Sequence, residues 1–137
     1  TAISTVAKLL REATHSALFV DPYADANLLT DYAILAPEQV TVRVLTNRNF
    51  KPALKPAATA WTFQHGTVRP LEVRLAAAGR LHDRLIAIDD RKVWSVGQSF
   101  NALAARSPTA ILLVDADARE LKLSAYSAIW NDATPLE

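Results

Sequence analysis

A histidine, an arginine and an aspartate that could act together lie in the segment LHDRLIAIDD, residues 81–90. His82 and Arg84 are two residues apart, so in an extended strand both side chains project from the same face. A neutral imidazole can attack phosphorus, and a guanidinium can offset the charge that develops on phosphoryl oxygens. Asp89 follows at the end of the expected strand. The segment therefore favours phosphate chemistry, with His82, Arg84 and Asp89 as candidate catalytic residues.

A second polar segment, GQSFN at residues 97–101, follows shortly afterwards. Its pattern predicts a turn that leads into a helix beginning near Ser99. The hydroxyl of Ser99, the amide of Asn101 and the free backbone N–H groups of a helix N-terminus are all suited to an anion. Gly97 suits a turn or a close backbone approach. We expect Gly97, Ser99 and Asn101 to bind the phosphate.

Together the two segments resemble the motif of the phospholipase D superfamily, which is His-x-Lys, four residues, Asp, six residues, then Gly-Ser-x-Asn. His82 matches the nucleophilic histidine, Arg84 stands in place of the lysine, and Asp89 keeps the first spacing. The last part matches only with Gln98 inserted, whereas Asp90 in place of Asp89 would restore the second spacing and break the first. The resemblance implies a phosphodiesterase that works through a phosphohistidine, without metal or cofactor.

A wider likeness covers most of the chain. The segments DPYADANLL, VRVLTNR, LEVR, LHDR and VDADAREL occur in an order similar to that of the phospholipase-D-like C-terminal domain of MIT-domain proteins and its bacterial relatives. In that branch the reactive motif is eroded, and the eukaryotic members bind phosphoinositides. The likeness implies a phosphate-bearing ligand, either nucleic acid or a phospholipid headgroup.

Enzymes of this superfamily use two copies of the motif, one histidine attacking and the other protonating the leaving group. One copy is present here, so we expect a homodimer in which the two His82 side chains meet at the symmetry axis. Asp21, at the end of the first expected strand, is a candidate to orient His82 from behind.

Composition limits the class of protein. The 137 residues suit a single domain, residues 1–137, which we expect to be excised from a longer protein because the chain opens inside an apparent helix. A net charge of +1 provides no broad basic field, so a polyanion must be bound locally. The absence of cysteine excludes thiolate sites, and the three histidines lack metal-ligand spacing. No apolar run approaches the ~20 residues of a membrane span. We predict a cytoplasmic, bacterial protein without a transmembrane segment.

Hydrophobic periodicity predicts an α/β sandwich of the phospholipase-D-like type, with a mixed, mostly parallel sheet and helices on both faces. A turn at residues 89–91 predicts a hairpin between two of the strands. The expected strands are residues 17–21, 40–45, 71–75, 81–89, 92–97 and 110–115, and the expected helices are residues 4–14, 25–36, 57–65 and 118–130, with a further one from about residue 99.

Other interpretations stay open. His82 can be an ordinary histidine at the end of a strand, and Arg84 can pair with Asp83 or Asp89. Ser99 can serve as a helix cap. The chain would then be a catalytically inert scaffold whose dimerisation or protein-interaction surface is the functional feature.

Overall fold

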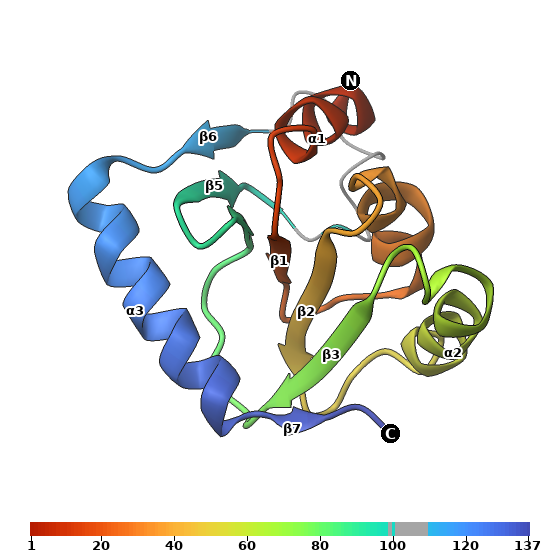
Figure 1. Cartoon of the computed structure of the whole chain (residues 1–137). Coiled ribbons are helices and arrows are strands. Elements are labelled where there is room, and N and C mark those ends of the chain that lie inside the picture. Colours follow the sequence, from red (N-terminus) through yellow and green to blue (C-terminus); the bar gives the residue numbers. More distant parts are fainter. Residues whose placement is uncertain (99, 101–109) are drawn as a thin grey trace.

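The computed structural model describes residues 1–98, 100 and 110–137. Within this part of the chain, a seven-stranded sheet runs through the molecule in the order β6-β5-β4-β1-β2-β3-β7, with helices on both faces (Figure 1). The α/β sandwich predicted from the sequence is therefore confirmed. The strands are β1 (Ser16–Val20), β2 (Thr41–Asn47), β3 (Leu71–Ala76), β4 (Leu85–Ile88), β5 (Lys92–Val96), β6 (Ile111–Leu113) and β7 (Thr134–Pro135).

The sheet is mixed, but its description as mostly parallel is wrong in detail. In the described residues β1, β2 and β3 are parallel to one another, whereas the other four neighbouring pairs are antiparallel. β4 and β5 form the predicted hairpin, in which Asp89 and Asp90 adopt positive φ angles of 56° and 53°. A short turn reverses the chain, so strands joined in this way are necessarily antiparallel.

One face of the sheet is covered by α1 (Ala2–Leu10), the short helical segments η1 (Leu28–Tyr32) and η2 (Ala33–Leu35), and α2 (Leu54–His65). α1 begins earlier than predicted because Thr1 is its N-cap residue and Ser4 is the third helical residue, which completes the capping box. α2 also begins earlier, since Pro56 lies in its first turn, where a missing N–H group costs no helical hydrogen bond.

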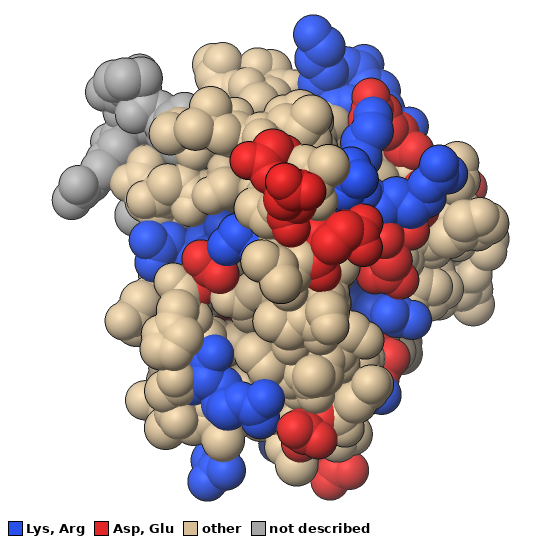
Figure 2. Space-filling model, turned by 90° about the vertical axis from the view of Figure 1, so that its left-hand side faces the viewer, with Lys and Arg blue, Asp and Glu red and all other residues tan. Residues whose placement is uncertain are grey.

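The other face is covered by α3 (Ala116–Asp132), which lies on the opposite side of the sheet from α1 and α2 (Figure 1). Asp115 caps it by accepting a hydrogen bond from the N–H of Ala118. Lysine, arginine, aspartate and glutamate side chains are interspersed on this side of the molecule, without a field of one sign (Figure 2). None of the described helices combines the length and the apolar character needed to cross a bilayer.

Two apolar clusters fill the space between the sheet and its helices. The larger lies on the α1 and α2 side and includes Phe19, Tyr32, Trp61 and Phe100. The smaller lies beneath α3 and is built from two groups, the sheet residues Leu18, Val20, Leu45, Leu85, Ala87 and Val93, and the helix residues Tyr126, Ile129 and Trp130. Alternate residues of each central strand therefore face different clusters.

Candidate functional site

His82 and Arg84 lie in an irregular segment that leads into β4, and not in the strand itself. β4 begins only at Leu85, so the predicted strand over residues 81–89 is wrong at its start. Side chains nevertheless continue to alternate through this segment, because Leu81 joins the cluster beneath α3 and Asp83 is bonded to α3. His82 is exposed and Arg84 is half-buried, and neither side chain shares the contacts of Leu81 and Asp83 with the α3 side.

Arg84 is half-buried and its charge is unmatched. Its Nε atom is buried without a hydrogen-bond partner, and no described carboxylate forms an ion pair with it. The undescribed positions, residue 99 and residues 101–109, contain no Asp or Glu. The carbonyl of Arg84 accepts a hydrogen bond of 2.9 Å from the N–H of Val96, which fixes this backbone beside the end of β5. A half-buried guanidinium whose Nε atom has no acceptor is a favourable place for an anion.

The pairing of Arg84 with Asp83 or Asp89, considered from the sequence, does not occur. Asp83 instead accepts hydrogen bonds from Lys122 at 3.1 Å and from the hydroxyl of Tyr126 at 2.8 Å. Burial alone would raise the pKa of Asp83, but the hydrogen bonds from Tyr126 and Lys122 and the positive charge of Lys122 hold it below its usual value.

This contact between Asp83 and α3 was not anticipated from the sequence. Lys122 and Tyr126 are four residues apart on one helix and so share a face, which was the available signal. The network ties the residue between His82 and Arg84 to α3. Burial and the neighbouring carboxylate of Asp83 raise the pKa of Tyr126 to about 12.

The segment GQSFN is described only in part, because Ser99 and Asn101 lie outside the described residues. Gly97 is exposed, and its N–H donates to the carbonyl of Ala110 at 2.9 Å. Phe100 is fully buried, with ring centroids 5.6 Å from Phe19 and 5.5 Å from Tyr32. The aromatic ring of Phe100 is therefore packed into the larger cluster.

Asp21, expected behind His82, is fully buried at the end of β1. Its Oδ1 atom accepts from the N–H of Tyr23 at 2.9 Å, and its Oδ2 atom accepts from the N–H of Phe100 at 2.8 Å. Phe100 is also held by its carbonyl, which accepts from Nδ2 of Asn27 at 3.1 Å. These contacts connect the carboxylate of Asp21 to the backbone of the candidate phosphate-binding segment.

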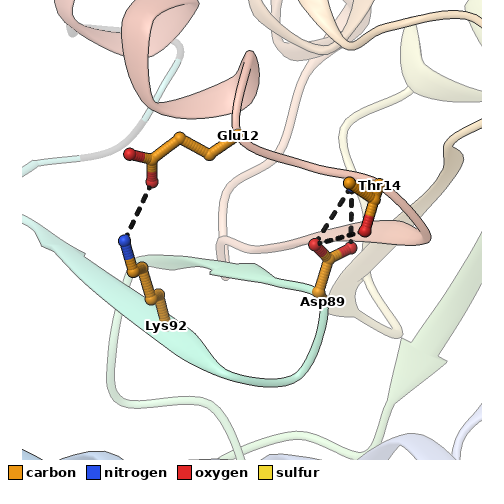
Figure 3. Close-up of polar contacts among 4 residues, drawn as sticks. All are labelled: Glu12, Thr14, Asp89 and Lys92. Atoms are coloured by element: carbon orange, nitrogen blue, oxygen red, sulfur yellow. Dashed lines mark hydrogen bonds and ion pairs between the residues drawn. The ribbon is translucent and has the colours of Figure 1, made fainter.

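Asp89 lies at the opposite end of β4 from His82 and Arg84. With a rise near 3.3 Å per residue, the five residues from Arg84 to Asp89 span roughly 16 Å. The carboxylate of Asp89 accepts hydrogen bonds from the backbone N–H and the hydroxyl of Thr14 (Figure 3). It also accepts from the backbone N–H groups of His15 and Ser16. The structure thus does not bring Asp89 together with the other two candidates.

The environment of Asp89 keeps it ionised. Partial burial alone would raise its pKa, but the hydrogen bonds from the backbone of Ser16, His15 and Thr14 hold the pKa below its usual value. A second link, between Lys92 and Glu12 at 3.2 Å, joins the same hairpin to the end of α1 (Figure 3). Asp90, the alternative acid of the motif, is exposed on the turn. Across the described residues, no three His, Asp or Glu side chains gather as a metal site.

Known proteins resemble this chain in structure but not detectably in sequence. No family model and no curated protein matches it. Nuc, a phospholipase D family member from Salmonella typhimurium, superposes with a TM-score of 0.67 at 14% identity over 98% of this chain and 90% of that one. NucT from Helicobacter pylori gives 0.64 at 12% identity, covering 98% and 91%.

A third similar structure is TrmBL2, an archaeal chromatin protein described as showing a novel mode of DNA binding. Its TM-score is 0.58 at 15% identity, over 98% of this chain and 49% of that one. Identities this low establish the fold and leave the chemistry of the site to its own residues. The chain has the phospholipase-D-like fold.

Proposed function

We propose that this domain recognises a phosphodiester through His82 and Arg84, with Gly97, Ser99 and Asn101 completing the anion site. The observation that carries the proposal is the buried Nε atom of Arg84, which has no hydrogen-bond partner in the described structure. A phosphoryl oxygen would supply the missing acceptor and the missing negative charge together. The exposed imidazole of His82, two residues away, is accessible to the same ligand.

The chemistry that this arrangement supports is a metal-independent phosphodiester cleavage in two steps. The imidazole of His82 attacks phosphorus, and the bond from phosphorus to the leaving oxygen breaks while that oxygen takes a proton from a second imidazole. Water then attacks the phosphorus of the phosphohistidine and gives a proton to the second imidazole, which lost one in the first step. The P–N bond to His82 breaks, and the phosphomonoester is released. The second imidazole is His82 of another copy, so catalysis in this proposal requires a homodimer.

The ligand class follows from charge and from the likeness to known proteins. A net charge of +1 favours a local contact with one or two phosphates over an extended polyanion groove. Nucleic acid and phospholipid headgroups both present such a diester. The likeness in fold to a phospholipase D family member and to a chromatin protein described as binding DNA supports recognition of such a diester. Turnover is weak in this proposal because arginine and lysine differ at a tight phosphate site.

Binding can be tested with dibutyl phosphate, titrated into 15N-labelled protein and followed by NMR. Arg84→Gln should weaken the affinity by about tenfold, as expected for the loss of a charge-assisted hydrogen bond. Arg80→Gln is the matched control, because Arg80 lies nearby in the chain and is already paired with Asp132 at 3.4 Å. Equal affinities for the Arg84→Gln and Arg80→Gln variants would contradict the proposal.

Turnover is tested separately. Hydrolysis of bis(4-nitrophenyl) phosphate in the presence of EDTA should be lost in His82→Ala, and brief incubation should label the wild-type protein with an acid-labile phosphate. Binding without hydrolysis would make the domain a recognition module. If the protein neither binds nor hydrolyses these phosphodiesters, both the recognition form and the catalytic form of the proposal are refuted.

A scaffold is the second candidate, favoured by exposed apolar side chains at one edge of the sheet. Leu112 and Leu113 of β6 and Leu121 of α3 are 64%, 55% and 75% exposed. A scaffold that pairs through this surface would form dimers that Leu112→Asp disrupts in sedimentation experiments, and it would bind no phosphodiester.

A further inference from the structure

A cavity of about 350 Å³ lies between α3 and the sheet. Its floor is a row of residues that lie side by side on four adjacent strands, Arg43 of β2, Leu18 of β1, Ala87 of β4 and Val93 of β5. With strands about 4.8 Å apart, this row is roughly 14 Å long. Ala87 is small, which leaves room above the middle of the row. The floor is thus apolar along most of its length and cationic at one end.

The roof of the cavity is one face of α3. Lys122, Tyr126 and Trp130 follow one another at intervals of four residues, and each lines the cavity. Trp130 lies above the Arg43 end, since the Arg43 guanidinium is 5.5 Å from the centre of its indole ring. The cavity is on the α3 side of the sheet, and neither His82 nor Arg84 is among its described lining residues. It is therefore separate from the candidate phosphate site.

Arg43 is the cation of this cavity whose charge is not balanced. Its Nε atom is buried without a hydrogen-bond partner, and it forms no ion pair with any described carboxylate. Arg74 offers a direct comparison, because it also packs on Trp130, at 4.6 Å. Arg74, however, is bonded to Glu72 at 2.8 Å and to the carbonyl of Trp130 at 2.9 Å. Arg74 and Arg43 pack on the same indole, but only Arg74 has hydrogen-bond acceptors for its guanidinium, whereas the Nε atom of Arg43 has none.

The remaining charges define the polarity of a ligand. Lys122 is already engaged by Asp83, so it adds little free positive charge. Asp90 is the only carboxylate among the described lining residues, and it lies on the β4–β5 turn, far along the row from Arg43. A second negative charge at that end would be repelled. The cavity therefore suits one negative charge near Arg43 and an uncharged body extending from it.

We propose that this cavity is a binding site for a small amphipathic monocarboxylate. The carboxylate accepts hydrogen bonds from the guanidinium of Arg43, and the aliphatic or aromatic body lies along Leu18, Ala87 and Val93. A carboxylate matches the planar guanidinium in a paired geometry and supplies the acceptor that the Nε atom lacks. Body and floor bury apolar surface against each other, as in small-molecule sites generally. This inference is independent of the proposed phosphodiester function.

Octanoate is the probe, with 1-octanol and octylamine as ligands of the same body and different charge. Isothermal titration calorimetry of the wild-type protein should show octanoate binding at least tenfold more tightly than 1-octanol, and octylamine not binding. Comparable affinity for the three ligands, or no binding of octanoate, would overturn the proposal. These comparisons need no variant and so do not depend on whether a variant folds.

The site is located with variants. Arg43→Gln should weaken octanoate binding by at least tenfold, whereas Arg74→Gln, the matched control beside the same indole, should change it less than threefold. Ser127→Phe adds bulk from an exposed position that lines the cavity, and it should abolish octanoate binding without disturbing the core. Arg84→Gln should leave octanoate binding unchanged, which separates this site from the phosphodiester site. Octanoate binding that survives both Arg43→Gln and Ser127→Phe would place the ligand elsewhere and refute the inference.

Discussion

The carboxylate of Asp89 accepts hydrogen bonds from both the backbone N–H and the hydroxyl of Thr14, which lies 75 residues earlier in the chain. Further N–H groups, of His15 and Ser16, point at the same carboxylate. The start of β1 is thereby fixed to the turn between β4 and β5. Asp89 fixes the position of the β4–β5 hairpin. Through β4 it influences where residues 81–84 lie, although it does not contact them.

Asp89→Asn should lower the free energy of unfolding at pH 7 by about 2 kcal/mol, because the substitution replaces charge-assisted hydrogen bonds and turns an NH2 group toward backbone donors. Asparagine tolerates the positive φ of this position, so the change isolates the carboxylate from backbone strain. Urea denaturation followed by circular dichroism measures the difference. Asp90→Asn, on the exposed next residue, is the control and should have little effect.

The pH dependence gives the same residue a second test. The pKa of Asp89 is lowered in the folded protein, so its stabilising contribution is present above the unfolded-state pKa of about 3.9 and disappears as the pH falls through the lower folded-state value. The stability difference between the wild type and Asp89→Asn should therefore narrow as the pH falls below about 3.9 and disappear once the pH is below the folded-state pKa of Asp89. A difference that stays constant from pH 7 to pH 3 would show that the carboxylate charge is not the cause.

Phe100→Ala should destabilise the protein by about 3 to 4 kcal/mol, because it removes a fully buried ring from between Phe19 and Tyr32. The same substitution should weaken dibutyl phosphate binding, since Phe100 lies between two of the proposed phosphate-binding residues. Phe100→Leu keeps most of the apolar volume and should retain most of both properties. Full phosphate affinity in a folded Phe100→Ala protein would show that the GQSFN segment is not part of the site.

Tyr126→Phe removes the hydroxyl that donates to Asp83 and should cost about 1 kcal/mol at pH 7. The effect of this substitution on stability is easier to recognise at high pH. The pKa of Tyr126 is raised to about 12 from about 10, so the contribution of its neutral form is complete below pH 10 and is lost as the pH rises through 12.

Thermal unfolding between pH 9 and pH 11.5 therefore separates the two proteins. The wild type should lose more stability over this interval than Tyr126→Phe, and its absorbance titration at 295 nm should show a late component that the variant lacks. Tyr32, whose pKa burial and Asp31 also raise, is present in both proteins and cancels in the comparison. Parallel losses in the two proteins would contradict the assigned contact.

The fold could be predicted from the sequence because each helix, strand and turn is indicated by residues that are close together in the chain. Alternating and helical apolar patterns identified the main strands and helices, and Asp89-Asp90 marked the hairpin. The sequence-based predictions were wrong where a contact with a residue distant in the sequence outweighs the local pattern. Residues 81–84 carry a strand-like pattern yet do not pair as a strand, and Asp83 of this segment is bonded to α3.

The candidate site was predictable in its residue types but not in its roles. Spacing within LHDR placed His82 and Arg84 together, while the motif alone could not show that the Asp89 carboxylate is occupied by backbone N–H groups of residues 14–16. Likewise, no sequence pattern reveals that Asp21 binds the N–H of Phe100, because the two are brought together only when β1 and the end of β5 are assembled. Long-range contacts of this kind decide which polar residues are free to meet a ligand.

Arg84→Lys distinguishes a ligand-binding arginine from a structural one. In phosphate-free buffer the substitution removes a buried N–H donor that has no described acceptor, so the free energy of unfolding should rise by about 1 kcal/mol or stay unchanged. Affinity for dibutyl phosphate should fall several-fold, because an ammonium is a point charge and cannot present the paired donors of a guanidinium. If Arg84 instead served the fold, the lysine variant would be less stable and would bind dibutyl phosphate as the wild type does. Urea denaturation and NMR titration of the same samples decide between the two roles. A ligand-binding arginine predicts reduced affinity without loss of stability, and a structural arginine predicts reduced stability without loss of affinity.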